Sequence, residues 1–219
     1  MIIKNISYFN WEKQVAIELS KCLKSKKNDI ILTGGTSVKK IYKYLFKILK
    51  QKKNKINIFL SDERCLSTPN PNLNANLFTL INKLSHVNFF PIILKNTSFK
   101  KCADIYERKV SKKPSFVLLS LAEDGHLASI FINSKALISK KKVVFEKKLY
   151  NGFRRITLSL KYLINKKIFI VCKDKKRLEA FFYFKNKKNH ILNYLIKKNK
   201  LLTIFVKKDD LRFLLRNSK

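Results

Sequence analysis

A chain of 219 residues is long enough to bury one substantial hydrophobic core, so we expect a single domain over residues 1–219. A hydrophobic content of 46% excludes an intrinsically disordered protein, although 29% of the residues are charged. No apolar run reaches the roughly 18 residues that a membrane span needs, and residues 1–6 lack the pattern of a signal peptide. These observations exclude an integral membrane protein and predict a soluble protein of the cytoplasm.

The formal net charge of +35 raises the question of a nucleic-acid partner. The lysines do not gather in one arm or tail, and most stand in small groups between apolar segments. An excess of lysine that runs through the whole chain is weaker evidence for a nucleic-acid partner than a local basic patch would be. We therefore interpret the charge as a solvated basic surface and expect no nucleic-acid partner.

Cysteine and histidine give no sign of a metal site or a disulfide framework. The four cysteines form no C-x-x-C pair, and the three histidines are far apart along the chain. The sequence therefore predicts no metal centre.

The first half of the chain alternates predicted helices and buried strands. A helix at residues 11–23 is followed by a strand at residues 29–33, the turn TGGTS at residues 33–37, and a helix through residues 41–49. A strand, a glycine turn and a helix aim backbone N–H groups at an anion. A single phosphate is therefore a candidate ligand, whereas the alternative is a tight turn in which Thr36 or Ser37 caps the helix.

A second buried strand, at residues 56–60, ends in the charged segment SDER at residues 61–64. These charged residues form either a solvated corner or part of a site. A loop rich in proline and asparagine follows. The next predicted elements are a helix at 73–84, a short strand at 89–94 and a helix at 98–110 in which Ser98 is a candidate cap.

The central strand is predicted at residues 116–121 and is followed at once by Glu123, Asp124, Gly125 and His126. The apolar spacing of residues 127–131 predicts a short helix after them. A carboxylate and an imidazole thus stand at the carboxyl end of a strand, where open α/β sheets form their ligand crevice. The alternative is an ordinary turn in which Asp124 caps the helix.

The remaining elements continue the alternation of strands and helices. They are an edge strand at 143–145, a strand at 154–160, a short helix to 165, a strand at 168–172, helices at 175–184 and 191–197, a strand at 201–206 and a helical turn at 211–215.

Buried strands that alternate with helices predict an α/β fold with a mostly parallel sheet covered by helices on both faces. Right-handed crossovers place the turns at residues 33–37, 61–64 and 121–126 on one rim of that sheet. Three of the chain's four glycines lie in two of these turns, where a positive φ or close backbone approach is needed. The arginines Arg64, Arg154, Arg155 and Arg177 lie in or just after the turns and offer a planar fork for phosphate or carboxylate.

Four segments resemble the 6-phosphogluconolactonases, in the order and spacing of that family. They are residues 33–37 (TGGTS), 61–65 (SDERC), 122–131 (AEDGHLASIF) and 154–159 (RRITLS). The resemblance covers nearly the whole chain, and the family belongs to a larger group with the glucosamine-6-phosphate isomerase/deaminases.

The resemblance implies a Rossmann-like α/β fold and the hydrolysis of 6-phospho-D-glucono-1,5-lactone to 6-phosphogluconate, a step of the oxidative pentose phosphate pathway. It implies a small phosphorylated sugar lactone as the partner and no cofactor.

On these matches His126 is the candidate general base, because imidazole titrates near neutral pH. Asp124 is expected to orient its ring. The substrate carbonyl is expected near Arg64 or backbone N–H groups, and Arg64 is alternatively a phosphate ligand. The other expected contacts divide between phosphate and sugar. The phosphate residues are Gly34, Gly35, Thr36, Arg155 and Lys176, with Lys175 nearly as good as Lys176, and the residues for the sugar hydroxyls are Asp62 and Asn76.

Several positions depart from the family pattern. Prolines usual in the family are replaced by Val38, Ile132 and Lys161, and a frequent glycine by Lys173. Ala122 stands where the family usually has glycine, so a positive φ there would cost about 1 kcal/mol or more.

Two other functions compete with lactone hydrolysis. An amino-sugar-phosphate deaminase usually has a glutamate soon after the Asp-Gly-His segment, whereas residues 127–133 contain no carboxylate. A degenerate α/β domain whose basic surface binds RNA would instead show salt-sensitive binding without catalysis.

Overall fold

The structure is a computed structural model that describes residues 1–6, 9–24, 26–79, 81, 84–94 and 97–217. Its main sheet has seven strands in the order β1-β10-β9-β6-β2-β3-β5, and every neighbouring pair is parallel. The strands are β1 (Ile2–Ile6), β2 (Lys27–Leu32), β3 (Lys55–Leu60), β5 (Val87–Phe90), β6 (Phe116–Ser120), β9 (Ile168–Val171) and β10 (Leu202–Lys207).

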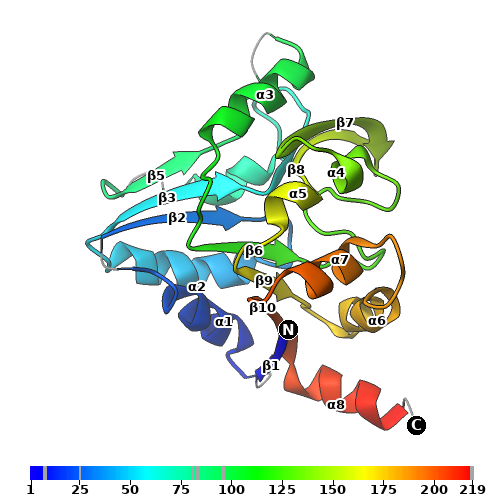
Figure 1. Ribbon diagram of the computed structural model, residues 1–219. Helices are drawn as coiled ribbons and strands as arrows, with labels where there is room; N and C mark the ends of the chain where they lie inside the picture. The colour runs from blue at the N-terminus through cyan, green and yellow to red at the C-terminus, as the bar shows by residue number, and fades with distance from the viewer. Residues whose placement is uncertain (7–8, 25, 80, 82–83, 95–96, 218–219) are drawn as a thin grey trace.

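Helices cover both faces of this sheet. Figure 1 shows α1 and α2 on one side of β2 and β3, and α3 on the other. The helices are α1 (Trp11–Ser20), α2 (Lys39–Lys50), α3 (Phe99–Lys109), α4 (Lys135–Ile138), α5 (Leu160–Leu163), α6 (Lys175–Phe184), α7 (Ile191–Lys198), α8 (Lys208–Asn217) and the 3₁₀ helix η1 (Asn74–Phe78). The predicted Rossmann-like α/β class is therefore confirmed.

The central strands β2, β3, β6 and β9 are almost entirely buried, which explains their near-continuous runs of Ile, Leu, Val and Phe. Helices α1, α2 and α3 each bury apolar side chains in the core, with Trp11 of α1 fully enclosed. One contiguous cluster of buried side chains thus fixes the sheet and the level at which its strands end.

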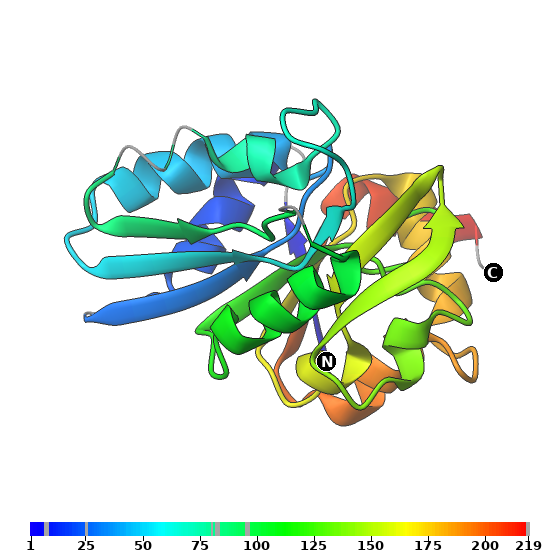
Figure 2. The same cartoon turned by 90° about the horizontal axis from the view of Figure 1, so that it is seen from above.

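A second, antiparallel sheet stands beside the carboxyl ends of the main strands (Figure 2). It has the order β4-β8-β7, formed by β4 (Asp62–Arg64), β8 (Phe153–Leu158) and β7 (Val143–Tyr150). Ser61 joins the two sheets, since its N–H donates to Leu32 O at 3.0 Å and its carbonyl accepts from Leu158 N at 2.8 Å. The segment at residues 61–64, predicted as a corner or part of a site, is therefore a short strand.

The sequence prediction fails at residues 127–131 and at the first strand, for different reasons. Residues 127–131 form no helix: Leu127 bridges to Leu121 and Ile130 in antiparallel fashion, and Ala128 has a φ of +53°. These apolar side chains are buried by a folded loop, and so Asp124 caps no helix. The edge strand β1 was not predicted, because Ile2 and Ile3 are exposed and its apolar pattern is weak.

Smaller differences concern element ends. The strand expected at 89–94 lies at Val87–Phe90, and the helix expected at 73–84 is the 3₁₀ helix Asn74–Phe78, with Leu80, Asn82 and Lys83 outside the described residues. Ser98 caps α3 as expected, accepting from Lys101 N. Neither Thr36 nor Ser37 caps α2, whose N-cap position is Val38, without a side-chain bond.

Tight turns in this chain rely on asparagine. In the described residues, positive φ outside glycine occurs at Ala128 and at five asparagines, Asn10, Asn133, Asn151, Asn165 and Asn189. Asparagine tolerates the left-handed region better than other side chains with a Cβ do. Ala122 does not have positive φ, so the strain considered at that position is absent.

Candidate active site

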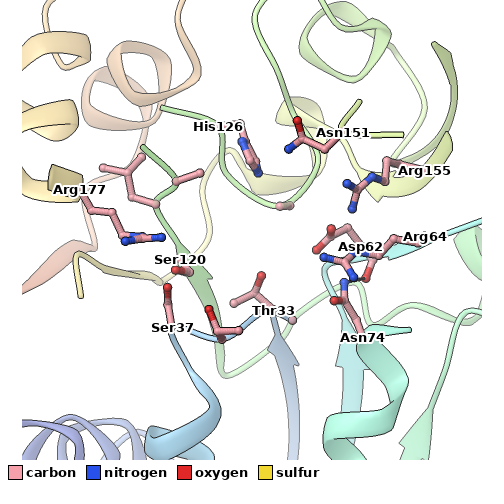
Figure 3. Close-up of a pocket in the computed structure, with 16 residues that line it drawn as sticks. Thr33, Ser37, Asp62, Arg64, Asn74, Ser120, His126, Asn151, Arg155 and Arg177 are labelled. Atoms are coloured by element: carbon pink, nitrogen blue, oxygen red, sulfur yellow. Dashed lines mark hydrogen bonds between the residues drawn. The ribbon is translucent and has the colours of Figure 1, made fainter. Parts of the chain in front are cut away.

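The three turns predicted to share one rim meet around a single cavity of about 190 Å³ (Figure 3). The cavity opens at the carboxyl ends of β2, β3 and β6, and the small sheet supplies its far wall. The lining residues are Thr33, Gly34, Gly35, Thr36, Ser37, Asp62, Arg64, Asn74, Ser120, Leu121, Ala122, His126, Ala128, Asn151, Arg155 and Arg177.

The glycine turn forms the floor of the cavity. Thr33 follows β2 and its carbonyl accepts a hydrogen bond from the buried Tyr42 hydroxyl at 2.5 Å, which ties the turn to α2. Gly35 has a φ of +94°, a conformation that only glycine adopts readily. The N-terminus of α2 is thereby brought to the cavity, where its N–H groups and dipole favour an anion.

Asn74 reaches the cavity from η1 and lies directly on Gly34. A Cβ added to Gly34 would lie 1.9 Å from Asn74 Oδ1, so only glycine leaves room for this amide. Asn74 Nδ2 donates to the carbonyl of Asp62 at 3.0 Å. The Pro/Asn-rich loop therefore returns to the cavity at Asn74. Asn76, the predicted sugar ligand, lies outside the cavity, where its amide donates to Asn70 O at 2.8 Å.

Glu63, which is almost fully buried, holds the end of this loop at Asn74 and Ala75. Its carboxylate accepts from Arg64 N and Asn74 N at 2.8 Å and from Ala75 N at 2.9 Å. Burial raises the pKa of Glu63 to about 7, although these three bonds oppose the shift. The residue therefore fastens β4 to the start of η1.

Asp62 is buried at the edge of the cavity with both carboxylate oxygens engaged. Oδ1 accepts from the Ser61 hydroxyl at 2.6 Å, and Oδ2 accepts from the Ser129 hydroxyl at 2.7 Å. Ser129 is itself held by its N–H, which donates to Thr157 Oγ1 at 3.1 Å. The Asp62 carboxylate is thus fixed in place before any ligand enters.

Two arginines stand side by side on neighbouring strands, since Arg64 of β4 is in register with Arg155 of β8. Arg155 donates to Tyr150 O at 3.1 Å and Arg64 donates to Asn72 O. Within the described residues, the Nε atoms of both are buried without a hydrogen-bond partner. Burial lowers the pKa of Arg155, the Asp62 carboxylate opposes this shift, and the Arg64 charge adds to it. The unused guanidinium donors of the two arginines are available to an anionic ligand.

His126 faces the cavity from the loop after β6. Its Nδ1 lies 2.5 Å from Asp124 Oδ1, and its ring packs on Phe131 with centroids 4.3 Å apart. Burial alone would raise the pKa of Asp124, but the hydrogen bond and charge of His126 leave that pKa lowered. An ionised Asp124 holds the Nδ1 proton, and Nε2 remains as the ring nitrogen that can act as a base.

The cation that α6 contributes to the cavity is Arg177. Its guanidinium pairs with Asp174 and lies 3.3 Å from Glu123, which follows β6. Lys176, the predicted phosphate ligand, is exposed and does not line the cavity, and Lys175 lies 3.8 Å from Glu179. Neighbouring helix positions point about 100° apart, so only one of these side chains can face inward.

Sequence reasoning missed Asn74, Ser120 and Asn151 as cavity residues. Ser120 ends β6, a position where inward-facing polar residues are expected, and Asn151 stands in the β7–β8 turn with a φ of +50°. Arg154 was singled out with the other arginines but is exposed and outside the lining. The positive φ of Asn151 is invisible in the sequence, whereas Ser120 carried a readable signal.

In the described part of the chain, no three His, Cys, Asp or Glu side chains stand close enough to hold a metal ion. The same residues include no helix long and apolar enough to cross a membrane.

Comparison with known proteins gives consistent relatives. Residues 10–190 match the family described as "Glucosamine-6-phosphate isomerases/6-phosphogluconolactonase". A 6-phosphogluconolactonase of Xylella fastidiosa is 31% identical over 133 residues, which is 57% of this chain and 55% of that protein. A probable 6-phosphogluconolactonase of Dictyostelium discoideum is 29% identical over 67% of this chain and 70% of its own. The chain thus spans little more than half the length of the Xylella relative.

Solved structures share the fold at lower identity. A 6-phosphogluconolactonase from Thermotoga maritima has a TM-score of 0.77 at 20% identity, covering 93% of this chain and 97% of its own. A monomeric glucosamine-6-phosphate deaminase has a TM-score of 0.75 at 15% identity, covering 97% and 99%. The family match extends over most of the chain, and the protein therefore belongs to the glucosamine-6-phosphate isomerase/6-phosphogluconolactonase family.

Proposed function

We propose that this protein hydrolyses 6-phospho-D-glucono-1,5-lactone to 6-phosphogluconate. The observation that carries the proposal is the Asp124–His126 pair, whose His126 ring lines the same cavity as the glycine turn and three arginines. A base, an anion-binding turn and excess positive charge are what hydrolysis of a phosphorylated ester requires. The relatives named as 6-phosphogluconolactonases support the same substrate.

The phosphate is assigned to the turn that holds Gly34, Gly35 and Thr36, at the N-terminus of α2. Arg155 and Arg177 supply charge from opposite walls of the cavity (Figure 3). Arg177 takes the role expected of Lys176, because Arg177 lines the cavity and Lys176 does not. Guanidinium forks suit phosphate oxygens better than a single ammonium does.

The reaction begins when His126 Nε2 removes a proton from a water molecule that attacks the lactone carbonyl carbon. Asp124 stabilises the imidazolium that forms. Arg64 is assigned to the carbonyl oxygen, where negative charge develops. The C–O bond of the ring then breaks, and the imidazolium returns its proton to the departing ring oxygen. Asp62 and Asn74 are assigned to the sugar hydroxyls, with Asn74 in place of Asn76.

This reaction places the protein in the oxidative pentose phosphate pathway, and the expected compartment is the cytoplasm. Its partner is a small phosphorylated sugar lactone.

The test is a lactonase assay against the spontaneous decay of the lactone. Purified protein is expected to accelerate that decay, and His126→Ala to remove most of the acceleration, about a hundredfold or more in kcat. His86→Ala is the matched control, because the His86 ring bonds Leu49 O at 2.9 Å outside the cavity. Full activity in a folded His126→Ala variant would refute the assignment of the base.

The second candidate is deamination of glucosamine 6-phosphate, since the matched family and one structural neighbour include that activity. Release of ammonia from that substrate, without lactone hydrolysis, would favour it.

A further inference from the structure

Two stacked rings lie against the catalytic loop and are not among the residues that line the cavity. His190 stands at the start of α7 and is only 3% exposed. Its ring stacks on Phe184, the last residue of α6, with centroids 4.4 Å apart and planes inclined by 15°. Neither residue is part of the proposed reaction, yet both lie against the loop that carries it.

The His190 ring has a fixed orientation because one nitrogen is already used. Nδ1 accepts the N–H of Leu192 at 3.2 Å and so caps α7. Burial lowers the pKa of His190 to about 4, although Asp124 opposes the shift. The ring is therefore neutral near pH 7, and because Nδ1 accepts, the proton resides on Nε2.

Nε2 and the Phe184 ring meet Gly125, the residue between Asp124 and His126. A Cβ added to Gly125 would lie 2.5 Å from Phe184 Cδ2 and 2.8 Å from His190 Nε2. Gly125 also has a φ of +84°. The backbone of the loop thus rests directly on the two rings, with no side chain between them.

The rest of the loop is held from other directions. Gly125 N donates to Ala122 O and Ala122 N donates to His126 O, both at 3.1 Å. Glu123 reaches Arg177 at the opposite end of α6. The loop is therefore closed on itself and tied to the N-terminal end of α6, while Phe184 at the other end of that helix supports it from behind.

We propose that His190 and Phe184 are positioning residues for the Asp124–His126 pair. The stacked rings fix the position and orientation of the Gly125 backbone. They thereby set the direction in which the Asp124 and His126 side chains leave the backbone. A displacement of about 1 Å at a reacting group can cost about a hundredfold in rate. This inference rests on the proposed function for its kinetic part only.

The experiment separates the ring of His190 from its role as a cap. His190→Asn keeps a good capping side chain but removes the ring. We expect kcat to fall about tenfold or more while KM stays within about twofold. Ser98→Ala is the matched control: it removes the cap of α3, away from the cavity, and should lower stability without changing kcat.

A readout independent of activity is the NMR signal of the His126 ring. The chain has three histidines, so His190→Asn and His126→Ala identify two of the three sets of ring signals and leave His86 as the third. The His126 signals should shift in His190→Asn and remain in place in Ser98→Ala. If His190→Asn does not fold, Phe184→Leu removes the other ring and is expected to act in the same way.

Unchanged His126 signals, or an unchanged kcat, in a folded His190→Asn or Phe184→Leu variant would overturn the inference. If the wild-type protein hydrolyses no lactone, the proposed function fails. The ring signals of His126 still decide whether the stacked rings of His190 and Phe184 position the His126 side chain.

Discussion

At the residue scale, the contact between Gly34 and Asn74 constrains the cavity, because it leaves no room for a side chain at residue 34. Gly34 does not need glycine for its φ, since only Gly35, Gly125 and Gly152 among the described glycines have positive φ. It needs glycine because the Asn74 amide occupies the place where a Cβ would be. The turn and η1 are therefore fitted to each other across the binding site.

This contact predicts a loss of substrate binding in Gly34→Ala. The new methyl group must displace Asn74, which also disturbs its bond to the carbonyl of Asp62. We expect KM to rise about tenfold or more with a smaller change in kcat. The reason is that the glycine turn assigned to the phosphate moves, whereas the proposed base, His126, does not. Steady-state kinetics of the lactonase reaction measure both constants.

The double variant Gly34→Ala/Asn74→Ala is the control for this explanation. Removing the amide makes room for the methyl group, so the two substitutions together should cost less than the sum of their separate effects. Strict additivity would show that the two residues do not clash.

At the element scale, the Glu63 carboxyl group holds β4 to the start of η1. The folded protein raises the pKa of Glu63 to about 7 from an unfolded value near 4.5. The folded state therefore binds this proton more tightly than the unfolded state does. Its contribution to stability is fully present below about pH 4.5 and is lost as the pH rises through 7.

His190 changes in the opposite sense, because its pKa is lowered and its contribution to stability is lost as the pH falls toward 4. Only a difference between variants therefore isolates Glu63. We expect the free energy of unfolding of wild type minus that of Glu63→Gln to decrease between pH 4.5 and pH 8, by up to about 3 kcal/mol. Urea unfolding of both proteins across this range measures the difference, and a flat difference curve would contradict the assignment.

The same scale shows what the sequence could predict. Continuous apolar runs identified the buried strands β2, β3, β6 and β9, because a strand covered on both faces needs no polar alternation. The carboxyl ends of parallel strands share an edge, so the meeting of the three turns could be predicted from their order. The isolated apolar residues Leu127 and Ile130 were wrongly taken for a helix, because a compact buried loop has no periodic signature.

The candidate site was harder to predict where the correct residue is one or two positions away from an equally plausible one. Choosing Arg177 over Lys176 requires the rotation of α6 about its axis, which the packing of its apolar face determines. Choosing Asn74 over Asn76 requires the path of the loop before η1, and Glu63 sets that path through backbone bonds. Neither the rotation nor the path is encoded in local spacing.

At the scale of the whole molecule, the net charge of +35 creates a positive field that extends beyond the cavity. The proposed substrate, a phosphorylated lactone, is an anion that this field attracts, and Arg64 and Arg155, paired in register, add positive charge at the candidate site. If the proposed function holds, the excess of lysine over acidic residues favours substrate capture without any specific contact.

Screening by salt tests this effect. Raising the ionic strength from about 0.1 M to about 1 M shortens the Debye length from about 10 Å to about 3 Å. We expect kcat/KM for the phosphorylated lactone to fall about fivefold or more, with kcat little changed. Glucono-1,5-lactone, which lacks the phosphate, is the control and should show no such dependence. Equal salt dependence of the two substrates would argue against attraction by the field.

The asparagines with left-handed backbone have a consequence for how freely this molecule can vary. Asn10, Asn133, Asn165 and Asn189 each hold the left-handed region, which a residue branched at Cβ adopts only with strain. Few residues can replace asparagine at such positions, chiefly glycine and aspartate. These four positions therefore tolerate few substitutions although they lie on a polar surface. Sequence differences among related chains should be concentrated in the segments between them.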